Sequence, residues 1–262
     1  MDIRAISDAE TDLPPNIIVV QADSCKSAFA AMASGLKKDG VNLAVWNGAQ
    51  KLVPDEFRKA IQDISDSSLN GRVDTQRDIA IEKDRLLSYL AGDFRRARTE
   101  QYIHCHYAAD IRDKKKQIAP DLLALWEDST QKICRAVDEL FGLTYTKLTT
   151  WFQAVAAVPD YHVDLNLTGT NKTLVLRTLS GPATLFVADK DRGRQSGSPY
   201  PNSYAINPDT ERLWALEQGS IALLTQNKNT PEVVHTAPFM QPGINPRRTV
   251  EILAFTTRKP IV

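Results

Sequence analysis

The sequence predicts a mixed α/β (α+β) protein in which supporting helices and a few strands lead into a series of short strands. Helical patterns with capping residues fill much of the chain up to Gly142, and alternating strand patterns separated by turn residues follow it. With 262 residues, 42% of them hydrophobic, the chain is long enough for a large core. We expect a single domain, 1–262, with a mainly helical part, 1–142, and a strand-rich part, 143–262.

The N-terminal part is expected to alternate strands and helices after a polar segment that reaches Pro15. Runs of β-branched residues predict strands. Runs of good helix formers predict helices, the first with Asp23 or Ser24 as its cap and Gly40 as its stop. The clearest helix begins at Pro120. The expected elements are strand 16–20, helix 26–38, strand 41–45, helix 54–64, polar loop 65–71, helix 74–90 and helix 120–141.

Short strands separated by turns fill the C-terminal part. The expected strands are 146–158, 161–167, 172–179, 183–187, 219–224, 233–238 and 248–255. The polar stretch 189–209 is expected to be a long loop. So many short strands are what a jelly-roll core, the double-stranded β-helix, requires.

Two of these strands carry candidate metal ligands. Side chains alternate along a strand, so His162 and Asp164 leave one face together. His235 arrives from a distant short strand. Two histidines and one carboxylate on one face of Fe(II) leave the remaining positions open for O2 and a co-substrate. The pattern predicts an iron site in which these three residues are both ligands and catalytic residues.

The order His162-x-Asp164, then His235, then an arginine about a dozen residues later resembles the Fe(II)/2-oxoglutarate-dependent dioxygenases. The resemblance covers roughly the C-terminal half. It implies a cupin-like core, Fe(II) as cofactor, 2-oxoglutarate and O2 as co-substrates, and oxidation of a small molecule. Hydroxylation is the default outcome, and desaturation, cyclisation or demethylation would use the same ligands. Asp164 argues against halogenation, because the related halogenases lack this carboxylate.

Two neighbouring arginines are candidates for 2-oxoglutarate binding. In this family an arginine on the last core strand holds the distal carboxylate through a bidentate pair. In a strand, Arg248 shares a face with Val250 and Ile252, which favours it as the inward residue. Arg247 with Thr249 instead fits the family's pairing of the arginine with a hydroxyl residue two positions on. The choice stays open, and Arg247, Arg248 and Thr249 are all candidates.

Other polar residues are candidate substrate contacts. Strand parity puts Asn166 on the face of His162 and Asp164. The stretch 189–209 falls where this family often carries an insertion that covers the substrate. Apart from the strand parity that favours Asn166, each candidate is equally consistent with a surface residue. The candidates are Gln153, Asn166, Arg177, Arg192 and Tyr204.

Composition narrows the class of partner. Lys plus Arg and Asp plus Glu number 32 each, so no net charge steers the protein toward nucleic acid or an anionic membrane. No apolar run approaches the roughly 18 to 20 residues that span a bilayer, and no secretory signal is visible, so a cytoplasmic location is expected. The expected partner is a small-molecule substrate, such as an amino acid or a biosynthetic intermediate. A homodimer is left open.

The remaining cysteines and histidines receive no catalytic role. Cys25, Cys105 and Cys134 are widely spaced and odd in number, which predicts buried reduced thiols rather than disulfides. His104 and His106 would share a face only in a strand, whereas the surrounding sequence favours a helix.

Two alternative functions remain. A cupin-type Fe(II) oxygenase that does not use 2-oxoglutarate predicts that neither Arg247 nor Arg248 points at the metal. A non-catalytic barrel would hold a structural or regulatory metal, or none, and structural sites are usually closed.

Overall fold

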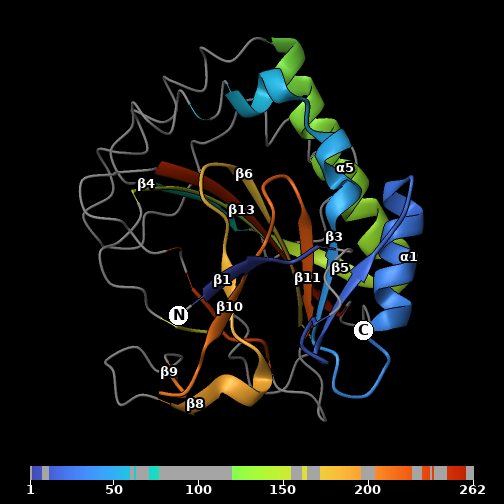
Figure 1. Cartoon of the computed structure of the whole chain (residues 1–262). Helices are drawn as coiled ribbons and strands as arrows, with labels where there is room; N and C mark the ends of the chain where they lie inside the picture. The colour runs from blue at the N-terminus through green and yellow to red at the C-terminus, as the bar shows by residue number, and fades with distance from the viewer. Residues whose placement is uncertain are drawn as a thin grey trace.

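In a computed structural model, the protein has two β-sheets that face each other and helices on the outer side of the larger sheet (Figure 1). The structure describes residues 2–7, 12–59, 62, 71–76, 120–154, 161–163, 172–195, 204–225, 232–236, 238 and 247–257. The predicted mixed α/β class is confirmed. Among these residues the two sheets stay separate and do not close into a barrel.

The larger sheet of the described residues has seven strands. In spatial order they are β2 (Ile17–Val20), β3 (Leu43–Trp46), β11 (Ile221–Thr225), β6 (Lys172–Ser180), β13 (Arg247–Thr257), β5 (Leu143–Ala154) and β4 (Gly71–Gln76). The first two strands run parallel, and the other neighbours are antiparallel. The long strand β13 lies between β6 and β5, so its backbone is paired on both edges.

The smaller sheet has four strands in the described residues. In spatial order they are β1 (Asp2–Ala5), β10 (Arg212–Ala215), β7 (Leu185–Phe186) and β12 (His235–Thr236). A separate two-stranded ribbon is formed by β8 (Arg192–Gln195) and β9 (Tyr204–Ile206). The described residues also form helices α1 (Cys25–Gly35) and α5 (Pro120–Phe141), the short 3-10 helices η1 (Asn47–Leu52) and η3 (Asp189–Asp191), and a helical segment at 55–59 and 62. In the described part of the chain, no helix has the length and apolarity to cross a membrane.

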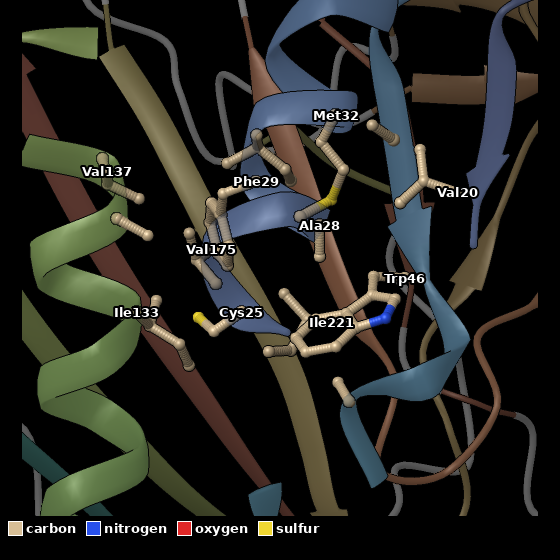
Figure 2. Packing of buried hydrophobic residues seen from close by; sticks show 14 of the residues in the cluster. Val20, Cys25, Ala28, Phe29, Met32, Trp46, Ile133, Val137, Val175 and Ile221 are labelled. Atoms are coloured by element: carbon tan, nitrogen blue, oxygen red, sulfur yellow. The ribbon is translucent and has the colours of Figure 1, made fainter. Parts of the chain in front are cut away.

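One hydrophobic core lies between α1, α5 and the larger sheet (Figure 2). Ser24 begins α1 with a capping box, because its side chain accepts from the Ser27 N–H while the Ser27 side chain contacts the Ser24 N–H. The helix then buries Phe29 and Met32 at helical spacing against Val175 of β6. Each large side chain buried in this way contributes about 1.5–3 kcal/mol.

A second core fills the space between the two sheets. Phe186 of β7 and Trp214 of β10 come from the smaller sheet, and Leu176 of β6 and Val250 of β13 come from the larger one. Residues of β3 contribute to both cores in alternation, so this strand is apolar on both faces, as central strands are. The space between the sheets is therefore lined from both sides.

Several elements differ in extent from the sequence-based expectation. Helix α1 starts at Cys25 and ends at Gly35, whereas 26–38 was expected. A helix in the expected range 54–64 begins at Asp55 and is described to Lys59 and at position 62. The expected strand 161–167 appears as an isolated bridge at His162, and 164–167 lie outside the described residues.

Four strands replace other expected structure. Strand β1 lies in the polar segment before Pro15, β4 includes 74–76 at the start of the expected helix 74–90, and β8 and β9 lie in the expected loop 189–209. The physical reason is pairing with distant partners: β1 pairs with β10, and β4 pairs with β5. Such pairing overrides local propensity. The rest of the expected helix 74–90 and the pair His104 and His106 lie outside the described residues.

Candidate metal centre

His162 and His235 lie side by side. Their backbones form an isolated antiparallel bridge in which each N–H donates to the other residue's carbonyl, at 2.9 and 3.0 Å. The centroids of the two imidazole rings are 4.5 Å apart, with an interplanar angle of 56°. His235 is 3% exposed. The structure thus brings together the two histidines that the sequence singles out.

The position of His235 is fixed by the edge of the smaller sheet. It pairs with Phe186 of β7, and the two rings have centroids 5.9 Å apart. The preceding residue, Val234, accepts a hydrogen bond from the Val187 N–H at 2.9 Å. Short apolar stretches on both strands therefore set the register at which the histidine appears.

Both histidines point into the space between the sheets. Val234 and Val163 belong to an apolar cluster with Leu185 and Leu213 on the other face of the smaller sheet. Side chains alternate along extended backbone, so the neighbours His235 and His162 take the opposite, inner face. The contact of His235 with Phe186, a member of the core between the sheets, agrees with this direction.

The His235 ring has a backbone carbonyl beside its Nδ1 atom. Its Nδ1 lies 3.4 Å from the carbonyl oxygen of Val233. In the tautomer that donates from Nδ1, the Nε2 atom carries the lone pair that can bind a metal. Asp164, the third predicted ligand, lies outside the described residues. Among the described residues, which do not include Asp164, no group of three His, Cys, Asp or Glu side chains could hold a metal ion.

Arg248 reaches the same space from the larger sheet. It is 6% exposed, it alternates in phase with Val250 and Ile252 of the core between the sheets, and its Nη1 donates to Thr184 Oγ1 at 3.2 Å. Thr184 lies two residues before Phe186, the residue that pairs with His235. The Cα atoms of Thr184 and Phe186 are therefore within about 7 Å of each other. Burial lowers the pKa of Arg248 to about 10, so the guanidinium stays charged at neutral pH.

Some of the other candidates for co-substrate and substrate binding are described only in part. Arg247 begins β13 opposite Ala154, and Gln153 of β5 lies opposite Arg248 in the register of the backbone. The Thr249 hydroxyl is buried and has no hydrogen-bond partner in the described part of the chain. The structure describes only the backbone of Arg247 and Gln153. Asn166 lies outside the described residues.

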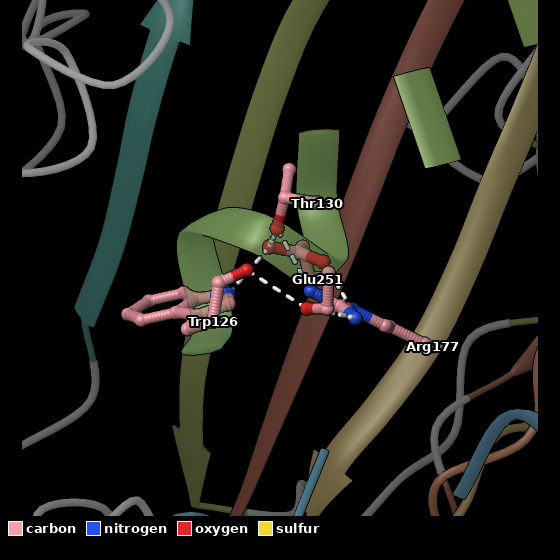
Figure 3. A network of polar contacts seen from close by, with 5 residues as sticks. Trp126, Thr130, Arg177 and Glu251 are labelled. Atoms are coloured by element: carbon pink, nitrogen blue, oxygen red, sulfur yellow. Dashed lines mark hydrogen bonds and ion pairs between the residues drawn. The ribbon is translucent and has the colours of Figure 1, made fainter. Parts of the chain in front are cut away.

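Arg177 lies on the opposite face of the larger sheet and contacts α5, which corrects the expectation of a substrate contact (Figure 3). Its guanidinium donates to Ser129 Oγ at 2.9 Å and Thr130 Oγ1 at 2.8 Å and forms an ion pair with Glu251. Glu251 also accepts from Trp126 Nε1 at 2.8 Å. These contacts join α5 to β6 and β13. Ser129 and Thr130 lie between the apolar helix positions Trp126 and Ile133, but nothing in the sequence pairs them with a residue of a distant strand.

Arg192 and Tyr204 lie on the ribbon, against the outer side of the smaller sheet. The Arg192 guanidinium carbon is 4.2 Å from the centroid of the Tyr204 ring, and Arg192 Nη1 donates to the Glu232 carbonyl at 2.9 Å. Tyr204 packs on the outer apolar cluster that contains Val163 and Val234. The ribbon thus contacts the segments that carry the histidines from outside rather than lining the space between the sheets.

Comparison with known proteins gives similarity in structure alone. No family model matches the sequence, and no curated protein matches it.

Three solved structures are similar to the chain over most of its length. The first is an oxidoreductase of the 2OG-Fe(II) oxygenase family from Burkholderia pseudomallei, at 10% identity and a TM-score of 0.43, covering 92% of this chain and 96% of that one. The epimerase SnoN in complex with Fe3+, α-ketoglutarate and nogalamycin RO has 12% identity and a TM-score of 0.41, covering 88% and 84%. EvdO2 from Micromonospora carbonacea var. aurantiaca, complexed with 2-oxoglutarate, has 12% identity and a TM-score of 0.40, covering 91% and 93%.

Proposed function

We propose that the protein is a non-haem Fe(II)/2-oxoglutarate-dependent oxygenase that oxidises a small molecule, by default through hydroxylation. The two sheets would form its double-stranded β-helix core. The observation that carries the proposal is the pairing of His162 with His235 on the inner face of the smaller sheet, in the space that Arg248 enters from the larger sheet.

The donor set fits Fe(II). A metal–nitrogen bond is about 2 Å long, so two imidazoles on one ion must lie close together, and ring centroids 4.5 Å apart meet this requirement. Asp164 would complete two histidines and one carboxylate, because the sequence predicts that it shares a face with His162. The same ligand set leaves positions open for O2 and a co-substrate.

Arg248 is the residue that we assign to the distal carboxylate of 2-oxoglutarate. Its planar guanidinium can donate two parallel hydrogen bonds to a carboxylate, and buried charge pairs are screened less than exposed ones. The hydrogen bond to Thr184 holds the side chain in one orientation before the co-substrate arrives. The inward direction of Arg248 favours it over Arg247, with Thr249 beside both.

The chain itself would bind and orient the reactants. Fe(II), 2-oxoglutarate and O2, when bound, would supply the oxidation of a C–H bond, which is chemistry of the cofactor rather than of the side chains. Phe186 and Trp214 line the space with apolar surface and would help to exclude water from it. An amino acid or a biosynthetic intermediate remains the substrate class that we propose.

The test is an anaerobic titration of the Fe(II)-loaded protein with 2-oxoglutarate, followed by the weak visible charge-transfer band of the chelated co-substrate. The Arg248→Ala variant should bind 2-oxoglutarate at least about 30-fold more weakly, because a buried partner of the carboxylate is lost. Arg247→Ala is the matched control and should bind like the wild type.

Other results would replace the proposal. Iron bound through His162 without any band would favour an oxygenase that does not use 2-oxoglutarate. A protein that binds no iron would leave a non-catalytic barrel. A band that is lost in Arg247→Ala but kept in Arg248→Ala would move the co-substrate role to the neighbouring arginine.

A further inference from the structure

The ribbon of β8 and β9 contacts the backbone on both sides of the histidine bridge. The first contact is at Tyr161, whose carbonyl accepts a hydrogen bond from the Tyr204 N–H at 2.7 Å. In an antiparallel pair, successive residues direct their backbone groups to opposite edges. His162 uses both of its groups on His235, so the Tyr161 carbonyl faces the other edge, where β9 lies. The segment 161–163 is therefore held between β12 and β9.

The second contact is made by the Arg192 side chain. Its Nη1 donates to the carbonyl of Glu232, three residues before His235, at 2.9 Å. Its guanidinium also stacks on the ring of Tyr204, the residue that holds Tyr161. One side chain thus contacts one histidine segment directly and the other through a single neighbour.

The ribbon is built as a fixed element. Arg192 pairs with Ile206 in the register of the two strands, and the Asn207 N–H donates to the Asp191 carbonyl at 2.8 Å at the base. A Cβ on Gly193 would lie 2.5 Å from the backbone oxygen of Ala205, so only glycine permits this approach of the strands. Tyr204 and Ile206 pack on the outer apolar cluster of the smaller sheet.

We propose that Arg192 is a positioning residue that fixes the backbones of the His162 and His235 segments relative to each other from outside the smaller sheet. The bonds that it makes to the Glu232 carbonyl and the Tyr204 ring join the two segments independently of the bridge itself. Its effect on a metal rests on the proposed function. Its effect on the backbone does not.

The experiment measures both effects separately. Amide hydrogen exchange of His162 and His235 is followed by NMR in the metal-free wild type and in Arg192→Ala. Co(II) affinity is then measured by anaerobic titration of the same proteins. We expect exchange at these two amides to be roughly tenfold faster in Arg192→Ala, because a charge-assisted bond is lost. Co(II) affinity should fall by about 10-fold, as for other residues that support metal ligands.

Matched variants separate positioning from general stability. Arg194→Ala removes the same charge from the same strand at an exposed position and should leave both measurements unchanged. Arg192→Lys keeps a donor for the Glu232 carbonyl and should give intermediate values. Gly193→Ala distorts the ribbon without touching Arg192 and should also speed exchange at the two histidine amides.

The outcomes distinguish this inference from the proposed function. Faster exchange in Arg192→Ala, in a protein whose wild type binds no Co(II), would uphold the positioning role and reject the metal centre. Wild-type exchange and affinity in Arg192→Ala would overturn the inference while leaving the metal centre intact. Exchange that is faster to the same extent throughout the chain would overturn it as well, because it would show general destabilisation. If Arg192→Ala does not fold, Tyr204→Leu, which removes the stacked ring, gives the same comparison.

Discussion

Arg248 and Glu251 lie three residues apart on β13 and point to opposite faces of the larger sheet. Arg248 bonds to Thr184 in the space between the sheets, and Glu251 accepts from Trp126 of α5 on the other side. The strand that presents the candidate co-substrate arginine is therefore anchored by a buried polar network behind it. We expect this network to contribute to the stability of the fold.

Loss of the Arg177 guanidinium should destabilise the protein strongly. Arg177 is 2% exposed and Glu251 is 0% exposed, so Arg177→Met leaves the carboxylate buried without its ion-pair partner. Removal of one partner of a buried pair costs about 3–5 kcal/mol. The free energy of unfolding in urea measures it. The double variant Arg177→Met, Glu251→Leu should recover much of the loss, because well-packed apolar residues often replace a buried pair without cost.

An exposed ion pair provides the control for this prediction. Lys26 Nζ lies 3.4 Å from Glu139 Oε2, and both side chains are largely exposed. Lys26→Ala should change the free energy of unfolding by less than about 1 kcal/mol. An Arg177→Met variant as stable as Lys26→Ala would contradict the role of the network.

The carboxylate of Asp189 should make stability depend on pH. Burial raises the pKa of Asp189, while hydrogen bonds from Asn42 Nδ2 to both carboxylate oxygens at 3.1 Å and the nearby Arg192 counteract it. Because the pKa is higher in the folded state, the charged form costs stability above this pKa, and the cost disappears as the pH falls through it. The stability of the wild type relative to Asp189→Asn should therefore rise on acidification from pH 7.

Urea unfolding measures the difference in the free energy of unfolding between the wild type and Asp189→Asn. The pH is lowered stepwise from 7 to the ordinary pKa of an aspartate. A wild type that loses stability relative to Asp189→Asn on acidification would show that the hydrogen bonds outweigh burial. Asp189→Ala removes the acceptor of the buried Asn42 amide and should cost about 1–3 kcal/mol across this range.

The thiols of Cys25 and Cys134 should be unreactive in the folded protein. Burial raises the pKa of Cys25 to about 11 and raises the pKa of Cys134 as well. Alkylation requires the thiolate, which is scarce at pH 8 under these conditions. Iodoacetamide should therefore modify neither thiol before unfolding and both after it, as measured by mass spectrometry of the peptides. Native-state modification of Cys25 at the rate of the unfolded chain would contradict its burial. Cys105 lies outside the described residues.

The sequence predicted those elements whose pattern is local. The alternation of Arg248 with Val250 and Ile252 predicts that they share one face. In β13, Val250 and Ile252 pack in the core between the sheets and Arg248 bonds to Thr184 there, although the ladders with β6 and β5 each contain a register shift. The bridge at His162 and the short strand at His235 lie within the ranges where turn residues and apolar runs predict strands. Period-two patterns carry this information without knowledge of the partner strand.

Structure that depends on distant partners could not be predicted. In the range 71–76 only Val73 and Thr75 alternate with polar residues, which is too short a pattern to predict a strand, and the range becomes β4 through pairing with β5. The sequence does not show that Arg177 is buried against α5, because its partners Ser129, Thr130 and Glu251 come from other parts of the chain. The polar range 192–195 resembles a loop, and it becomes the strand β8 through antiparallel pairing with β9.

An anaerobic Co(II) titration of the wild type and three single-histidine variants tests the proposed metal centre most directly. We predict that the wild type binds one ion and that His162→Ala and His235→Ala each weaken binding by at least about 100-fold, because each loses a metal ligand. His104→Ala, the matched control, should bind like the wild type. Wild-type affinity in both His162→Ala and His235→Ala, or a wild type that binds no Co(II), would contradict the assignment of the metal centre.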